Sequence, residues 1–280
     1  MNSESLFPRP QAERLSVINF DMKISLIQMN VRAGDTEYNF VRAGELISEA
    51  ARENPDVIIL PETWNTGFFP GEATGELADC GGAEVKALLS QLSRKYNVNI
   101  IGGSATERKN GFIYNTCYIY DRKGKNIASY SKTHLFSPMG ENLYYKAGDS
   151  FCSFEIDGIK AAVLICYDLR FPEAARRLAL AGAEVLFIPA QWPRERIAQM
   201  EILLKARAVE NQMYAVLCNS TGTAGSTVFG GNSLVISPLG EELVRCSDKE
   251  ETAVSDIDIS EAEHLRKQID VFSDRRPSLY

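Results

Sequence analysis

The sequence is poor in the residues that build metal sites and disulfide frameworks. It contains two histidines, and none of its six cysteines lies in a CxxC pair. Because zinc sites draw on closely spaced cysteines and histidines, we expect no zinc site and no other metal. We also expect no organic cofactor. Several cysteines lie in apolar, strand-like runs, which predicts reduced thiols in a cytoplasmic protein.

Long apolar runs are missing as well. No stretch approaches the ~18 residues that a helix needs to span a bilayer. The first 20 residues contain two prolines and several charges, and they lack the continuous apolar core of a secretory signal. The net charge of −7 comes from interspersed charges of both signs, which argues against a nucleic-acid or anionic-membrane surface. We therefore expect neither nucleic acid nor membrane as a partner.

Linker-like composition is also scarce along the 280 residues. There is no Pro/Gly/Ser-rich stretch, low-complexity run or charge block that would mark a domain boundary. Residues 1–21 join no pattern, whereas a strand-like segment begins at Met22. We expect a leader or disordered extension over residues 1–21 and one domain over residues 22–280.

Helical and strand-like periodicities alternate through most of the chain. Apolar residues at helical spacing predict helices over residues 38–52, 83–96, 172–181 and 194–211. Short apolar runs predict strands at 22–29, 57–60, 98–102, 113–121, 126–132, 151–156, 159–166, 184–189, 213–219, 232–237 and 251–259. This alternation, interrupted by hairpins, predicts an α/β fold with a mixed sheet, and it leaves the layering open.

Three polar side chains stand where apolar strands end: Glu62, Lys132 and Cys166. Backbone N–H groups at a strand-to-helix turn, where Cys166 lies, lower the pKa of a thiol and form an oxyanion site. Taken alone, each residue has an ordinary interpretation, as a solvated loop carboxylate, an exposed hairpin lysine and a core thiol. Together they offer a carboxylate, an ammonium and a thiol at strand ends.

The three segments, LPETW with Glu62, YSKTHLF with Lys132 and ICYDLRFPE with Cys166, resemble the catalytic motifs of the nitrilase superfamily of carbon–nitrogen hydrolases. The resemblance runs from about Lys23 to the C-terminus, and within the family the chain looks most like the ω-amidase branch. Further matching segments are Gly102-Gly103-Ser104, Tyr114-Asn115-Thr116, Tyr145-Lys146-Ala147-Gly148, Pro189-Ala190-Gln191-Trp192-Pro193 and residues 206–212. The resemblance implies a four-layer α-β-β-α sandwich that pairs through helices into a homodimer or a larger homo-oligomer.

The same resemblance implies a catalytic triad of Glu62, Lys132 and Cys166. Hydrolysis of an unactivated amide needs a nucleophile, a base and donors for the oxyanion. Cys166 would attack, Glu62 would move the proton, and Lys132 would stabilise the oxyanion together with the backbone N–H of Tyr167. The family commonly carries a second glutamate, here Glu141, that holds the lysine and helps to position substrate. The ordinary alternative for Glu141 is a surface loop acid.

Three further residues are expected to bind substrate. Trp192 follows a predicted strand and should face the pocket, with a core or interface aromatic as the alternative. Arg196 stands one turn later and is the expected clamp for a substrate carboxylate, because a guanidinium matches a carboxylate bidentately. On the ordinary interpretation it is a solvated helix arginine. Tyr145 is expected to supply a hydrogen bond to substrate.

The residues around the nucleophile are expected to support it. Asp168, Arg170 and Glu173 should form ion pairs that fix the turn. His134 lies two residues after Lys132, and both side chains would point to the same face if that segment were a strand. His134 therefore stays a rival partner for the thiol, as in Cys–His enzymes. The family assigns the base to glutamate, which makes His134 a supporting residue.

The motifs predict a cysteine-dependent amidohydrolase that releases ammonia from a small linear amide through a thioester. The ω-amidase resemblance implies the terminal amide of an α-keto dicarboxylic acid such as α-ketoglutaramate. The chain departs from that branch at Gln199-Met200, where a His-Trp pair is frequent. N-carbamoyl-amine hydrolase, nitrilase and dipeptide or modified-glutathione amidase activities stay open, as does a non-catalytic metabolite-binding scaffold.

Overall fold

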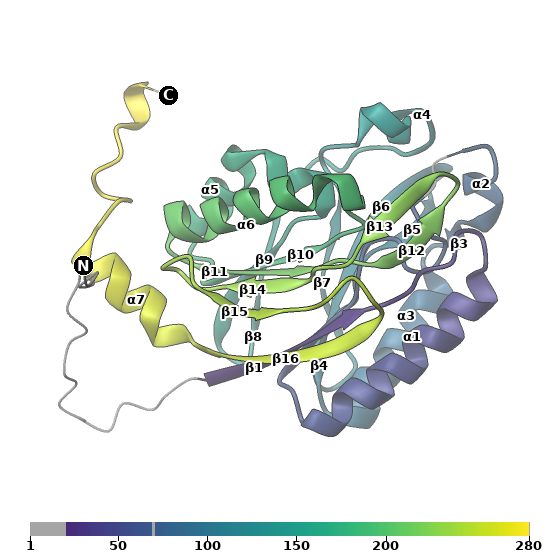
Figure 1. Cartoon of the computed structure of the whole chain (residues 1–280), viewed down its shortest axis with the longest axis horizontal. Coiled ribbons are helices and arrows are strands. Elements are labelled where there is room, and N and C mark those ends of the chain that lie inside the picture. The colour runs from purple at the N-terminus through teal and green to yellow at the C-terminus, as the bar shows by residue number, and fades with distance from the viewer. Residues whose placement is uncertain (1–20, 69–70, 280) are drawn as a thin grey trace, which may run out of the picture.

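Two β-sheets stack face to face in the middle of the molecule (Figure 1). The structure is a computed structural model, and it describes residues 21–68 and 71–279. The expected leader over residues 1–21 lies outside the described residues, except for Asp21, which begins the first strand. Within the described ranges no helix is both long and apolar enough to cross a bilayer.

The first sheet has eight strands in the order β16-β1-β2-β4-β6-β5-β3, and β7 pairs with β6 beside this path. β1 pairs antiparallel with β16 near the other end of the chain, and β2 runs parallel between β1 and β4. The strand bounds are β1 Asp21–Gln28, β2 Val57–Ile59, β3 Asp79–Cys80, β4 Asn99–Ile101, β5 Ala105–Lys109, β6 Phe112–Tyr120, β7 Asn126–Ser131 and β16 Glu251–Asp258.

The second sheet has six strands in the order β15-β14-β11-β10-β9-β8. Its three central strands, β9, β10 and β11, run parallel. The bounds are β8 Cys152–Ile156, β9 Ile159–Val163, β10 Val185–Pro189, β11 Tyr214–Cys218, β14 Leu234–Ile236 and β15 Glu242–Arg245. A separate hairpin pairs β12, Thr221–Ala224, with β13, Thr227–Gly230.

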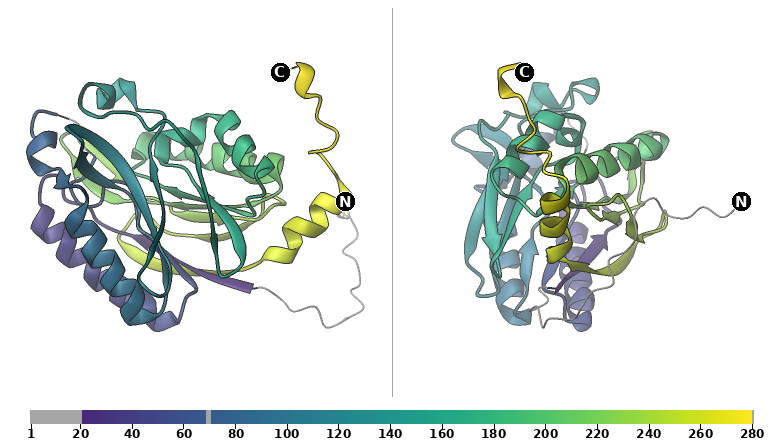
Figure 2. Two further views of the ribbon diagram at one scale, coloured as in Figure 1. Left: turned by 180° about the vertical axis from the view of Figure 1, so that it is seen from behind. Right: turned by 90° about the vertical axis from the view of Figure 1, so that its left-hand side faces the viewer.

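Helices cover the two outer faces of the stacked sheets. Helices α1 (Thr36–Ala50) and α3 (Ala83–Tyr96) lie on one side, and α5 (Pro172–Leu180) and α6 (Ile197–Asn211) on the other (Figure 1, Figure 2). The shorter helices are α2 (Thr74–Leu77), α4 (Glu141–Tyr144) and α7 (Ile259–Gln268). The 3-10 turns are η1 (Ala51–Glu53), η2 (Ser137–Met139), η3 (Cys166–Arg170), η4 (Arg194–Arg196) and η5 (Pro277–Leu279).

Alternate residues of one strand belong to different layers of the core. In β2, Val57 and Ile59 pack between the two sheets, whereas Ile58, together with Leu60 just after the strand, packs against α1 and α3. A strand buried on both faces shows no polar alternation, which is why the sequence left the layering open. The arrangement confirms the expected α-β-β-α sandwich.

The sequence predicted the long elements and missed several short ones. The four expected helices correspond to α1, α3, α5 and α6, and the last of these is preceded by η4. The elements without a sequence-based prediction are β3, β5, β12, β13, β15, α2, α4 and α7. Most of these strands span two to five residues and carry polar side chains on an exposed face, so hydrophobic periodicity does not mark them.

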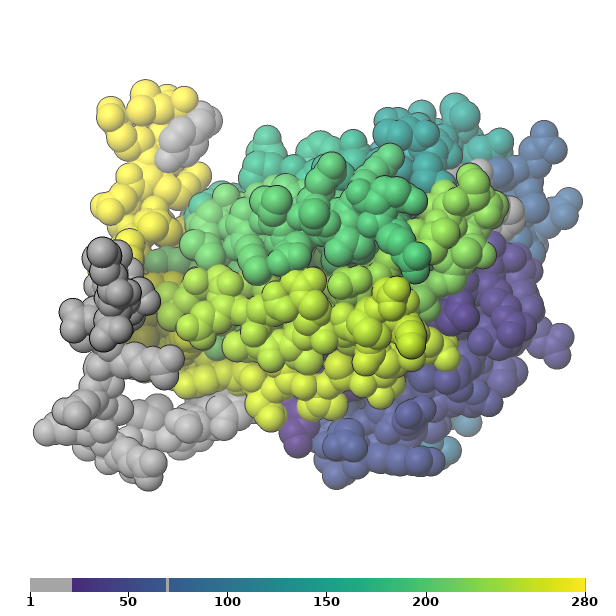
Figure 3. Space-filling view, in the orientation of Figure 1, coloured from purple at the N-terminus to yellow at the C-terminus, as the bar shows by residue number. Residues whose placement is uncertain are grey.

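The segment after α7 projects from the body of the molecule (Figure 3). The aromatic residues Phe272 and Tyr280 of this segment predict that residues 270–280 pack across a neighbouring subunit or along an edge of their own sheet. The ring of Phe272 lies 5.4 Å from the guanidinium of Arg176 in α5 and 5.3 Å from that of Arg266 in α7. This segment therefore contacts its own chain through Phe272, and Tyr280 lies outside the described residues.

Candidate active site

The three expected catalytic residues meet where strands of both sheets end. Glu62 follows β2, Lys132 directly follows β7, and Cys166 begins η3 after β9. β2 and β7 belong to the first sheet and β9 to the second, so the site spans both sheets. The carboxyl ends of strands are the usual place for a ligand site in α/β proteins, because the loops there can carry side chains of any chemistry.

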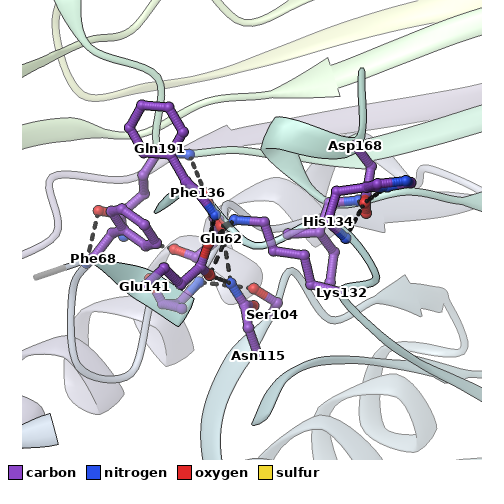
Figure 4. Close-up of polar contacts among 12 residues, drawn as sticks. Glu62, Phe68, Ser104, Asn115, Lys132, His134, Phe136, Glu141, Asp168 and Gln191 are labelled. Carbon is purple, nitrogen blue, oxygen red and sulfur yellow. Dashed lines mark hydrogen bonds and ion pairs between the residues drawn. The ribbon is translucent and has the colours of Figure 1, made fainter. Parts of the chain in front are cut away.

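Lys132 is held between two carboxylates (Figure 4). Its Nζ lies 2.8 Å from Glu62 Oε1 and 2.9 Å from Glu141 Oε2, and all three side chains are fully buried. Glu141 begins α4, and its Oε2 also accepts the backbone N–H of Phe136 at 2.5 Å. The structure thus brings Glu141 to the lysine, away from the solvent that a surface acid would contact.

The charges in this group shift one another's pKa values. Burial alone would lower the pKa of Lys132, but the carboxylates of Glu141 and Glu62 and the nearby Cys166 raise it well above its ordinary value. Burial raises the pKa of Glu141, Lys132 opposes that shift, and Glu62 adds to it. The lysine is therefore an ammonium at neutral pH, and it serves two carboxylates at once.

Asn115 and Gln191, for which the sequence predicted no role, donate hydrogen bonds to Glu62. Asn115 donates from Nδ2 to Glu62 Oε1 at 2.9 Å and to Glu141 Oε1 at 3.2 Å. The backbone N–H of Gln191 donates to Glu62 Oε2 at 3.0 Å. Both residues lie in segments that match the family, so their importance could be predicted from the sequence. The sequence alone does not predict which carboxylate each of them binds.

The loop that carries Glu62 depends on a close backbone approach. Thr63 has a φ of 36°, and its N–H donates to Ser104 Oγ at 2.9 Å. At Gly103, which has a φ of 63°, an added Cβ would lie 2.1 Å from the carbonyl oxygen of Pro61. Only glycine fits at this position, which gives a physical reason for the Gly-Gly-Ser segment after β4.

Cys166 occupies a strained turn. Its φ of 44° lies in the left-handed region that residues other than glycine rarely adopt. Burial and the Glu62 carboxylate raise the pKa of the Cys166 thiol well above its ordinary value, whereas Lys132 lowers it. The expectation of a lowered thiol pKa is therefore wrong, because desolvation and the neighbouring carboxylate outweigh the ammonium.

A pocket opens at the half-buried thiol. It contains about 340 Å³ of space between atoms, part of which is open to solvent. Cys166, Lys132 and Gln191 are among its lining residues, and the ring of Phe68 lies 5.0 Å from Lys132 Nζ. The other lining residues are Phe136, Met139, Tyr167, Arg170, Trp192, Pro193 and Arg196.

Two guanidinium groups line this pocket. Arg196 lies 5.4 Å from the ring of Phe136. Arg170 lies 5.0 Å from the ring of Trp192 and donates to Gln199 Oε1 at 2.8 Å. The expectation that Arg170 joins an ion-pair set around the turn is therefore wrong, since its side chain extends to the pocket wall.

Comparison with known proteins agrees with this geometry. Residues 23–267 match the family model of the carbon-nitrogen hydrolases. The chain is 41% identical over 257 residues to the 2-oxoglutaramate amidase of Bacillus subtilis (strain 168), with 92% of this chain and 98% of that protein covered. This chain belongs to the carbon–nitrogen hydrolase family.

The hydrolase is also 32% identical over 271 residues to omega-amidase NIT2 of Homo sapiens, with 92% of this chain and 96% of that protein covered. The crystal structure of a carbon-nitrogen hydrolase from Helicobacter pylori G27 superimposes with a TM-score of 0.86 at 26% identity, over 93% of this chain and 97% of that one. The expected superfamily is confirmed. The protein is an enzyme that hydrolyses carbon–nitrogen bonds other than peptide bonds.

The two tyrosines of the expected site take different places in the hydrolase. Tyr167 lines the pocket, and its ring lies 4.9 Å from that of Phe136. Tyr145 is buried, and its hydroxyl pairs with Thr106 Oγ1 at 2.8 Å. Its backbone N–H donates to the carbonyl of Glu141 at 2.8 Å. The structure therefore places Tyr145 in the framework that supports Glu141, apart from the described pocket lining.

In the hydrolase, the His134 ring contacts Asp168 and Phe171. β7 ends at Ser131, so Lys132 and His134 are not consecutive same-face residues of a strand. His134 Nδ1 lies 2.8 Å from Asp168 Oδ1, and its ring stacks on Phe171 at 3.8 Å. Figure 4 shows this contact on the other side of the Lys132 stem from Glu62. The geometry favours a supporting role for His134.

Proposed function

We propose that this hydrolase is a cysteine-dependent ω-amidase. Its substrate would be the terminal amide of an α-keto dicarboxylic acid such as α-ketoglutaramate, and its products ammonia and the dicarboxylate. The observation that carries the proposal is the meeting of a buried carboxylate, a buried ammonium and a half-buried thiol at one pocket. The names of the two relatives, a 2-oxoglutaramate amidase and an omega-amidase, support the substrate.

The reaction begins with the thiol. Because the pKa of Cys166 is raised, the resting group is protonated, and Glu62 takes its proton as sulfur attacks the amide carbon. Lys132 Nζ and the backbone N–H of Tyr167 stabilise the oxyanion. Collapse of this intermediate breaks the C–N bond, Glu62 returns the proton to nitrogen, and ammonia leaves. Water then attacks the thioester and Glu62 accepts its proton. Collapse of the second intermediate breaks the C–S bond, the dicarboxylate leaves, and Glu62 returns the proton to the Cys166 sulfur.

The contacts of Glu62 suit this repeated proton transfer. Lys132 and Asn115 hold Oε1, and the Gln191 N–H holds Oε2, so the carboxylate cannot rotate away from the thiol. Glu141 keeps Lys132 in place when the charge of Glu62 is neutralised by a proton. The site can therefore cycle between proton states without rearranging.

The pocket walls suit a small acid with an apolar chain. Phe68, Phe136 and Trp192 supply apolar surface for the methylene groups. A substrate carboxylate buried among them needs a cation, because an unpaired carboxylate in a closed pocket is costly. Lys132 is committed to Glu62 and Glu141, which leaves Arg196 as our proposed clamp, with Arg170 as the other available guanidinium.

We also propose that the enzyme works as a homodimer or larger assembly in the cytoplasm. Ile202 and Val209 are 69% and 48% exposed in the single chain, and their spacing of seven residues puts them on one side of α6. Leu239 is 55% exposed, and a Cβ at its neighbour Gly240 would meet Val209, so the patch continues beyond the helix. Apolar patches of this kind mark interfaces.

Light scattering tests the assembly. The wild-type protein should have the mass of a dimer or a larger species, and Ile202→Glu should have a smaller mass because a charge in the patch opposes association.

Ammonia release from a panel of compounds tests the proposed activity. The panel contains α-ketoglutaramate, succinamate, an N-carbamoyl amine and a simple nitrile. We expect the highest kcat/KM on α-ketoglutaramate, and Cys166→Ala should lower it by at least ~1,000-fold. Cys152→Ala, which changes another half-buried thiol, is the matched control.

Other results would identify the alternatives. A preference for the carbamoyl compound or the nitrile would assign a different branch of the superfamily. No turnover of any compound would favour a binding protein. Activity retained in Cys166→Ala would remove the thiol mechanism altogether.

A further inference from the structure

Asp168 is a fully buried carboxylate that the proposed chemistry does not use. It lies two residues after the nucleophile, and both of its oxygen atoms accept hydrogen bonds. Oδ2 accepts the backbone N–H of Ile165 at 2.9 Å and the hydroxyl of Tyr130 at 2.8 Å. Oδ1 binds the hydroxyl of Thr133 at 3.1 Å, the backbone N–H of His134 at 3.0 Å and His134 Nδ1 at 2.8 Å. One carboxylate therefore accepts hydrogen bonds from several backbone and side-chain donors, which fixes its position.

One side of this carboxylate closes the turn that presents the thiol. While Ile165 N–H donates to Asp168 Oδ2, the backbone N–H of Asp168 donates to the carbonyl of Ile165 at 2.9 Å. Cys166 lies within this reciprocal pair and has its φ of 44°. A left-handed conformation of this kind is strained for a residue other than glycine, and it persists only where surrounding contacts over-determine it. The Asp168 side chain supplies one of those contacts.

The other side of the carboxylate holds the segment that carries Lys132. Tyr130 lies in β7 before the lysine, and Thr133 and His134 follow it. All three donate to Asp168. The His134 ring adds a second link to the turn by stacking on Phe171 with an interplanar angle of 11°.

We propose that Asp168 is a positioning residue that sets the placement of Lys132 Nζ relative to the Cys166 thiol. This inference rests on the proposed function, because it concerns the geometry between the proposed nucleophile and the proposed oxyanion donor. The first sheet supplies the lysine and the second supplies the cysteine. Asp168 is a direct side-chain tie between these two segments, so it fixes a distance that neither sheet fixes alone.

The hydrogen-bond pattern requires a carboxylate at position 168. A backbone N–H points at each oxygen, from Ile165 at Oδ2 and from His134 at Oδ1. An asparagine has one acceptor and one NH₂ group, and neither backbone N–H can reverse its direction. Asp168→Asn must therefore release one of the two segments, whichever way its amide turns.

Steady-state kinetics of Asp168→Asn on the preferred amide test the proposal. A misplacement of about 1 Å costs on the order of 100-fold in rate, so we expect kcat to fall by about that factor while KM stays within about threefold. His134→Gln keeps the backbone N–H on Oδ1 and is the matched control, with an expected loss of about tenfold or less. Thermal unfolding of each variant establishes that it is folded at the assay temperature.

A folded Asp168→Asn enzyme with kcat within about twofold of wild type would overturn the proposal, as would a rise in KM at unchanged kcat. If Asp168→Asn does not fold, Tyr130→Phe decides the question, because it removes one donor and leaves the ring in the core. A lower kcat at unchanged KM in that variant supports the tie, and an unchanged kcat refutes it. Failure of the proposed function is recognised separately, by activity that persists in Cys166→Ala.

Discussion

The inner and outer parts of the active site are built in different ways. Inside, Lys132 is fully buried and lies within 2.8–3.1 Å of Glu62 and Glu141 oxygen atoms. At the pocket opening, Arg170 and Arg196 are half-buried and rest on aromatic rings at 5.0 and 5.4 Å. Buried charges tolerate little change because an unpaired partner has no water to solvate it, whereas half-exposed groups do. We therefore propose that the inner group carries out the reaction and that the outer residues select which amide is accepted.

The largest effect should follow from Lys132→Met. This change leaves the carboxylates of Glu62 and Glu141 facing each other without a cation, and breaking a buried pair in this way costs about 3–5 kcal/mol. We expect a loss of that size in the free energy of unfolding measured by urea titration, together with loss of ammonia release. Lys146→Met, which changes an exposed lysine over the ring of Phe112, is the control. Equal, small losses in both variants would contradict the distinction between inner and outer groups.

A smaller loss is expected from Asn115→Leu, which keeps the approximate volume and removes the Nδ2 donor. Its bonds to Glu62 and Glu141 are charge-assisted, and we expect their joint loss to cost about 1.5–3 kcal/mol, because Lys132 still holds both carboxylates. Stability and kcat should both fall, because Glu62 loses one of the groups that orient it. Asn142→Leu on the exposed face of α4 is the control. Wild-type kcat in Asn115→Leu would show that Lys132 and the Gln191 N–H are enough to orient Glu62.

The outer residues should affect one class of substrate only. Arg196→Ala should lower kcat/KM on α-ketoglutaramate by about 10–100-fold, as for the loss of a charge-assisted hydrogen bond, and leave hydrolysis of a small uncharged amide nearly unchanged. Arg194→Ala is the matched control, because Arg194 shares η4 but pairs with Asp248 at 3.5 Å. If Arg170→Ala shows the selective loss and Arg196→Ala does not, the carboxylate is held on the Trp192 side of the pocket. Equal losses on both substrates would assign Arg196 a structural role.

The smallest change concerns the pH dependence of thiol reactivity in the free enzyme. Burial and Glu62 raise the pKa of Cys166, so the folded state favours the neutral thiol. The thiolate fraction should therefore keep rising about tenfold per pH unit beyond pH ~8.5, where an ordinary cysteine levels off. Modification of the Cys166 peptide by a small uncharged disulfide reagent, followed by mass spectrometry, measures this rate. A plateau below pH 8 would show that Lys132 outweighs the burial and the carboxylate.

The linked effect on stability has a definite sign. Because the folded-state pKa of Cys166 is raised, its contribution to stability is fully present below the ordinary thiol pKa and is lost as the pH rises through the folded value. Cys166→Ala removes this contribution. The stability difference between wild type and Cys166→Ala should therefore change in the alkaline range only.

Much of the fold was accessible from hydrophobic pattern, and the exceptions share a physical cause. The helices α1, α3, α5 and α6 each bury one apolar face against a sheet, so helical spacing predicts them. The short strand β5 and the hairpin of β12 and β13 form because neighbouring strands supply their hydrogen bonds. The partner strands lie nearby in sequence, but segments such as ATERK in β5 and TGTA in β12 are rich in small and polar residues, so hydrophobic pattern does not mark them.

The sequence by itself determined the family of this hydrolase and the groups that we propose for its chemistry. The motifs around Glu62, Lys132 and Cys166 predicted the three groups that meet in the structure. The prediction was possible because polar side chains at the ends of strands commonly lie together at one edge of a sheet. The family followed from these motifs and their order along the chain.

Only the tertiary structure decided how those groups influence one another. The raised pKa of Cys166, the partners of Asn115 and Asp168, and the place of Arg170 at the pocket depend on distances between segments of both sheets. Electrostatic and hydrogen-bond energies change steeply over a few ångströms and with burial. A sequence motif specifies neither these distances nor the burial of its residues. The same motif is therefore compatible with a lowered or a raised thiol pKa.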